Sequence, residues 1–161
     1  MTSVTIEYVI LIPLLFSQVI LFPFVASTMT SSWQDSQRNI ELQDAADHLA
    51  STIQQLYLTI NSEDILAGDI TQTSPVPVTV GSYPYDATCS LSDPPGGSAN
   101  VLTVTLILDE VDNRATASAV LGTNVQWIDS TLRSNSADAS INVQKLDDDE
   151  HTIVFSFGEA D

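Results

Sequence analysis

The sequence predicts an α+β protein in which a long N-terminal hydrophobic α-helix leads into an antiparallel β-sandwich-like globular head. Three compositions follow one another along the 161-residue chain. Residues 8–34 are apolar and uncharged, residues 35–60 are amphipathic at helical spacing, and residues from 68 onward carry short alternating runs rich in Thr, Ser and Val. We therefore expect an assembly helix over residues 1–60 and a β-rich, surface-exposed head over residues 68–161.

The apolar segment has the length of a membrane-spanning helix. Tyr8 to Ala26 is a stretch of 19 residues, which extends about 28 Å as an α-helix and matches a bilayer core of about 30 Å. Residues 1–6 contain no lysine or arginine, and this disfavours a conventional cleavable secretory signal. A stay of this segment in a membrane is therefore physically possible.

Two prolines, Pro13 and Pro23, interrupt the apolar segment. Each lacks an N–H group, so the carbonyls of Val9 and Val19 lose their usual helical donors. We expect a bend or local melting at each proline, with the stronger disruption just before Pro23.

A single charge, Glu7, stands directly ahead of the apolar segment. A carboxylate at such a place costs about 2.5–3.5 kcal/mol in hydrocarbon and requires a positive partner. The next cation along the chain is Arg38. The natural candidate is therefore a positive group on another copy of the chain, such as a free N-terminal amine.

The amphipathic half of the helix carries an apolar stripe whose members alternate by four and three residues. These residues are Leu42, Ala46, Leu49, Ile53, Leu56 and Ile60. Such spacing places them on one helix face. We expect the stripe to pack on the head and not to form a coiled coil with another partner.

Alternating runs predict strands at residues 76–80, 101–108, 114–121, 139–145 and 151–157. Turn-forming clusters separate them at residues 93–97, 109–113 and 147–150. Strands at this spacing without intervening helices favour an antiparallel sandwich or small barrel.

Charge and motifs exclude several classes of function. The net charge is −17 with only four basic residues, so a nucleic-acid partner is not expected. No catalytic motif is recognisable, and we expect no enzymatic activity, cofactor or metal. His48 beside Asp44 and Asp47, and His151 after an acidic run, are interpreted as solvated surface groups, while Cys89 is interpreted as a small, inert thiol.

The residues Thr5–Tyr8, followed by the apolar run Val9–Leu15, resemble the N-terminus of type IV pilin-like proteins. Two further features resemble the Tad-type branch in particular. An aromatic residue, Tyr8, directly follows the acid, and a proline, Pro13, lies six residues after the acid. Archaeal type IV pilins are similar in attaching a β-rich head to such a helix. The resemblance covers about the first thirty residues by motif and the remainder by architecture alone.

This resemblance implies a processing site at Ser3 and roles in assembly for Glu7, Tyr8, Pro13 and Pro23. Ser3 would be the first mature residue after cleavage by a prepilin peptidase, and Glu7 the fifth, neutralising the amino terminus of an adjacent subunit. Tyr8 and Pro13 complete the motif, and Pro23 resembles the helix-breaking proline of pilins. The implied partners are identical subunits, the membrane before assembly and the assembly machinery.

The expected function is that of a major pilin: a structural subunit of an extracellular type IV pilus-like filament, polymerising through N-terminal helices and serving adhesion or surface attachment. The expected location is the cell-surface filament, after an initial stay in the cytoplasmic membrane. The alternatives are a membrane-tethered surface protein that acts singly, a minor pilin or pseudopilin, and an archaellin-like filament subunit. Archaellins usually lack an acid at this place and favour Gly, Ala and Val in the helix.

Overall fold

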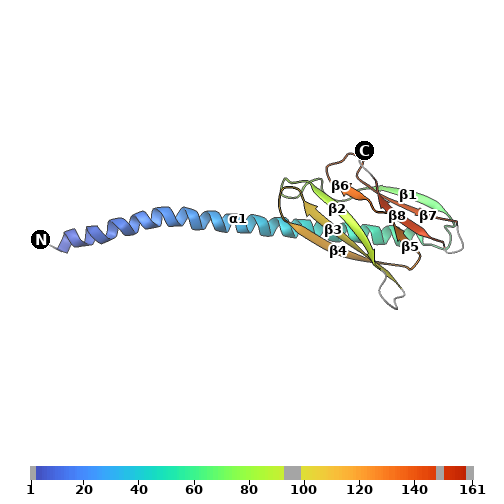
Figure 1. Cartoon of the computed structure of the whole chain (residues 1–161), viewed down its shortest axis with the longest axis horizontal. Helices are drawn as coiled ribbons and strands as arrows, with labels where there is room; N and C mark the ends of the chain where they lie inside the picture. Colours follow the sequence, from blue (N-terminus) through green and yellow to red (C-terminus); the bar gives the residue numbers. More distant parts are fainter. Residues whose placement is uncertain (1–2, 93–98, 148–150, 159–161) are drawn as a thin grey trace. The chain divides into compact units, whose positions relative to one another are not determined.

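The computed structural model describes residues 3–92, 99–147 and 151–158, with side chains from residue 11 onward. The described chain has one helix followed by eight strands (Figure 1). Their bounds are α1 (Ser3–Ile60), β1 (Gly68–Thr73), β2 (Tyr85–Ser92), β3 (Asn100–Leu108), β4 (Arg114–Leu121), β5 (Val125–Trp127), β6 (Thr131–Arg133), β7 (Ser140–Lys145) and β8 (Ile153–Phe157). The α+β class predicted from the sequence is confirmed.

The chain forms two compact units, and the boundary between them lies within α1. The first is Met1–Gln37, and the second is Arg38–Asp161. In the first unit, every described side chain from residue 11 to residue 37 is exposed. The second unit contains the remainder of α1 together with all eight described strands, which gather around this part of the helix in Figure 1.

The helix passes through both prolines without interruption. Pro13 and Pro23 lie inside α1, which is continuous from Ser3 to Ile60. The local melting expected at each proline is therefore not found in this structure. Each proline removes one hydrogen bond from a long cooperative helix, whose neighbouring turns keep their own bonds.

The first sheet has the order β4-β3-β2-β6 and is antiparallel throughout. The second has the order β1-β7-β8-β5, in which β5 pairs with β8 in parallel and the other two pairings are antiparallel. The expectation of a purely antiparallel head is therefore wrong at one edge. A parallel pair needs a long connection, and the 25 residues between the end of β5 and the start of β8 supply one.

Most strand predictions agree with the structure. The runs at 101–108 and 114–121 coincide with β3 and β4, and those at 139–145 and 151–157 contain β7 and β8. The run at 76–80 is not a strand, since only Val80 makes an isolated bridge, to Tyr83, and the prolines at 75 and 77 cannot donate to a ladder. The turn at 109–113 is present, with the Leu108 amide donating to Asn113 oxygen at 3.1 Å. The turn at 93–97 and residues 148–150 lie outside the described residues.

The core of the second unit joins the helix to both sheets. All six residues of the predicted stripe are buried, with at most 7% of their surface exposed. They belong to one hydrophobic cluster with the inward-facing residues of both sheets. On β3 and β4 burial alternates residue by residue, so one face of that sheet points to the core and the other to solvent.

Candidate functional site

The apolar part of α1 is the most distinctive surface of the described chain. Its large hydrophobic side chains are between 50% and 77% exposed: Leu11, Ile12, Leu14, Leu15, Phe16, Val19, Ile20, Leu21, Phe22, Phe24, Val25, Met29 and Trp33. Each Å² of apolar surface left in water costs about 25 cal/mol. A contiguous patch of this kind marks a surface that another molecule or a lipid phase covers.

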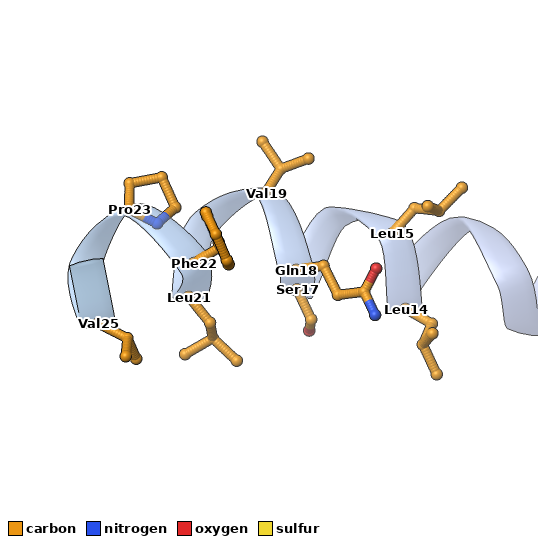
Figure 2. A pocket seen from close by; sticks show the side chains of 9 residues that line it. All are labelled: Leu14, Leu15, Ser17, Gln18, Val19, Leu21, Phe22, Pro23 and Val25. Carbon is orange, nitrogen blue, oxygen red and sulfur yellow. The ribbon is translucent and has the colours of Figure 1, made fainter.

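This apolar surface extends around the helix. Figure 2 shows Leu15, Val19 and Pro23 on one side of the ribbon and Leu14 and Val25 on the other. The hollow that these side chains line is formed by one helix and is open to solvent. A surface that is apolar on all sides requires surroundings on all sides, namely lipid or several neighbouring helices, and not a single partner on one face.

Three hydroxyl groups at the end of this segment donate to carbonyl groups of the helix itself. Thr28 Oγ1 donates to the Val25 carbonyl at 2.8 Å, Thr30 Oγ1 to the Ala26 carbonyl at 2.9 Å, and Ser31 Oγ to the Thr28 carbonyl at 3.0 Å. Side-chain donors paired in this way do not need water. The segment is therefore compatible with apolar surroundings through about residue 31.

Helix α1 is long and apolar enough to cross a membrane by length and composition. The 23 residues from Leu11 to Trp33 extend about 35 Å along the helix, against about 30 Å for a hydrocarbon core. An N-terminal signal sequence has the same properties. The structure is thus compatible with a membrane anchor or signal in this segment.

The predicted assembly residues are placed only in part. The backbones of Glu7 and Tyr8 belong to α1, and their side chains lie outside the described residues. Pro13 and Pro23 lie within the helix, and Pro23 contributes to the apolar surface around Phe22. The pairing of Glu7 with another copy remains a prediction.

Sequence reasoning missed a contact that holds the helix where it enters the second unit. The guanidinium carbon of Arg38 lies 5.3 Å from the centre of the Tyr83 ring, a cation–π distance. Val80 and Tyr83 exchange backbone hydrogen bonds across Gly81 and Ser82, which both have positive φ. A Cβ on Gly81 would lie 2.7 Å from Arg38 Cγ. The available signal was a Gly-Ser pair between two β-forming residues.

A buried lysine closes the other end of the helix. Lys145, the only lysine of the chain, is 4% exposed, and its Nζ donates to the Ser62 carbonyl at 3.1 Å. Ser62 lies two residues beyond the end of α1, where the helix dipole favours a positive charge. The sequence signal was weak, since Lys145 only ends an alternating run.

Side chains able to bind a metal are not clustered in the described part of the chain. Within residues 3–92, 99–147 and 151–158, no three His, Cys, Asp or Glu side chains lie close enough to share a metal ion. Asp47, one of the candidates near His48, accepts a hydrogen bond from Gln43 at 3.2 Å. Burial raises the pKa of the Cys89 thiol, which keeps it protonated and a poor nucleophile.

Comparisons of this chain with the profiles of known families, with characterised proteins and with solved structures find no match.

Proposed function

We propose that this protein is the major structural subunit of an extracellular type IV pilus-like filament, in which the apolar helices of many copies pack together. The observation that carries the proposal is the helix surface from Leu11 to Trp33, which is apolar on all sides and exposed throughout. Neighbouring helices of identical copies would bury that surface from every direction, as a filament core requires.

Glu7 favours a filament over a simple anchor. It is the sole charge before Asp35, and a carboxylate that enters apolar surroundings beside such a helix needs a positive partner. In a filament it would pair with the amino terminus of an adjacent subunit. The acidic head, with most of the chain's net charge of −17, would remain hydrated on the outside and serve surface attachment.

We also propose that the head is sandwich-like, with two sheets turned toward a common core. The inward residues of both sheets share one hydrophobic cluster with the stripe of α1. This arrangement would leave the first unit free to enter a filament while the second unit keeps its own core.

A membrane-tethered surface protein that acts singly is the second candidate, and a minor pilin or pseudopilin belongs with it. The observation that favours it is the length of the apolar segment, which suits one bilayer crossing. In that case the helix would be covered by lipid permanently, and the chain would not leave the membrane.

Electron microscopy of material sheared from cells that produce the chain would test the proposal. We expect long, thin filaments in which mass spectrometry identifies this chain as the principal component, and their loss when the chain is deleted. Recovery of the chain only from the membrane fraction, with no filaments, would establish the tethered alternative.

A further inference from the structure

The outer face of the β4-β3-β2-β6 sheet carries a regular array of hydroxyl groups. The register places one residue of each strand in a single row across the sheet: Thr116, Thr105, Thr88 and Thr131. The next row contains Ser118, Thr103 and Ser90. Side chains of adjacent strands are about 5 Å apart in such rows. The result is a face on which the rows of small polar groups lie between Ile107 at one end and Val101 and Val120 at the other, and whose opposite side is the buried core.

The strand residues on this face carry a net charge opposite in sign to that of the whole chain, although the acidic turn of Asp109, Glu110 and Asp112 lies at its end. The charged strand residues are Arg114 on β4, Arg133 on β6 and Asp86 on β2, which leaves one positive charge. Arg133 Nε lies 3.4 Å from Asp86 Oδ1. Arg114 is exposed, and no described carboxylate pairs with it. Two of the chain's four basic residues thus lie on this face, while the net charge of the chain is −17.

A groove elsewhere on the same unit has complementary chemistry. It is about 430 Å³ in volume, and α1 contributes Glu41, Asp44 and His48 to its wall. These positions lie on the side of the helix facing residues 75–80, which contribute Pro75 and Pro77. The two carboxylates are exposed, so the groove combines negative charge with an apolar wall.

We propose that the hydroxyl face of one head docks against the Glu41–Asp44 groove of a second copy, with Arg114 entering the groove. This inference rests on the proposed filament and names the contact between its heads. The two surfaces differ, so the contact is heterologous, and a heterologous contact whose rotation does not close joins copies head to tail into an open helical assembly, as a filament requires.

Three physical features support this pairing. Identical acidic heads repel one another, and the strands of the hydroxyl face carry one net positive charge, which reduces that repulsion. The aliphatic stem of Arg114 suits the proline wall, and its guanidinium suits the carboxylates of Glu41 and Asp44. The small Thr and Ser side chains of the two rows allow close approach and lose little rotamer freedom on contact.

The first test reverses the charge at Arg114 in the full-length chain. Arg114→Glu is expected to lower the yield of filaments about tenfold at low salt, since placing a third carboxylate against the groove makes the contact repulsive. The matched control is Gln54→Glu with Gln55→Glu, which adds the same two negative charges at exposed positions of α1 and should leave the yield near that of the wild type.

A charge swap keeps the test valid even when a single variant assembles poorly for other reasons. Combining Arg114→Glu with Asp44→Arg should restore filaments relative to Arg114→Glu alone. The loss caused by Arg114→Glu should also shrink at high salt, where exposed charges are screened. Equal filament yields for the wild type, Arg114→Glu and the control would overturn the docking. The proposed function would survive that result, whereas it would fail if the wild type formed no filaments.

A second test locates the contact directly. Arg114→Lys keeps the charge and introduces an exposed side-chain amine at position 114. The chain's own lysine, Lys145, is only 4% exposed and therefore reacts little. Filaments of this variant, grown from ordinary and nitrogen-15-labelled chains and treated with a carbodiimide, should yield mixed-isotope peptides joining position 114 to Glu41 or Asp44. Cross-links between copies that join position 114 to other carboxylates would overturn the proposal. It would equally be overturned by the finding, in intact-mass and peptide spectra, that glycans occupy the Thr and Ser rows of assembled chains.

Discussion

The substitution Leu49→Ala tests whether the apolar stripe of α1 is an integral part of the head's core. Leu49 is 0% exposed, at the middle of the stripe, and belongs to the cluster shared with both sheets. Removing three buried carbons, two methyl groups and a methine, costs their transfer free energy and leaves a cavity, in total about 2–5 kcal/mol. Leu49 shares its cluster with residues of both sheets, and their packing limits how far the site can collapse. We therefore expect the free energy of unfolding to fall by about 3–4 kcal/mol.

The measurement is guanidinium unfolding of the full-length chain in a mild non-ionic detergent. Trp127 contacts Phe157 edge to face, with ring centres 5.0 Å apart, so its near-ultraviolet circular dichroism reports on the head. A Trp33→Phe background removes the signal of the exposed tryptophan in the first unit. The midpoint should shift without a change in the denaturant dependence, because the surface exposed on unfolding stays nearly the same.

The matched control is Leu58→Ala on the same helix. Leu58 is 66% exposed, so its truncation should change the free energy of unfolding by less than about 0.5 kcal/mol. Equal stabilities of the Leu49→Ala and Leu58→Ala variants would refute the reasoning, since the stripe would then contribute nothing to the core of the head.

Four further predictions concern assembly and stability. Glu7→Ala should reduce filament yield while the circular dichroism of the head is unchanged, because the partner charge loses its counter-ion; normal yields would remove the pairing argument. A fragment beginning at Ser31 should be a soluble, β-rich monomer by circular dichroism and sedimentation, and an aggregated or unfolded fragment would contradict this. Gly81→Ala should destabilise the head by about 1–2 kcal/mol in guanidinium unfolding, because Gly81 has a φ of 55° and faces Arg38; an unchanged midpoint would exclude strain there. Burial raises the pKa of Tyr85 from 10.0 to about 12, so the free energy of unfolding should fall as pH rises between these values, where only the unfolded phenol ionises. Tyr85→Phe should reduce that pH dependence, and an identical pH profile for the two proteins would contradict the raised pKa.

Strands with strong local alternation were predictable, and strands that depend on partners were not. On β3, Leu102, Val104 and Leu106 alternate with threonines, so the run carries its own signal. Strand β2 alternates small and polar residues around Cys89, a pattern too weak to separate from a loop. Strands β5 and β6 have three residues each and exist through pairing with β8 and β2. Pairing of this kind is a long-range property that no local window contains.

The sequence could also mislead where local rules compete with cooperativity. Pro13 and Pro23 predict breaks by their missing N–H groups, yet α1 continues through both. Leu, Ile and Phe residues around them supply the neighbouring helical turns. A local penalty at each proline is smaller than the cost of abandoning an otherwise continuous helix.

The sequence by itself determined the apolar and amphipathic halves of the helix and the stripe from Leu42 to Ile60. It also determined the lone charge at Glu7 and the acidic character of the head. Periodicity and charge are local properties of a chain, so they can be read without the fold. Only the tertiary structure decided the parallel pairing of β5 with β8 and the contact of Arg38 with Tyr83. It likewise aligned the threonine rows beside Arg114, since strand register follows from contacts between residues far apart in sequence.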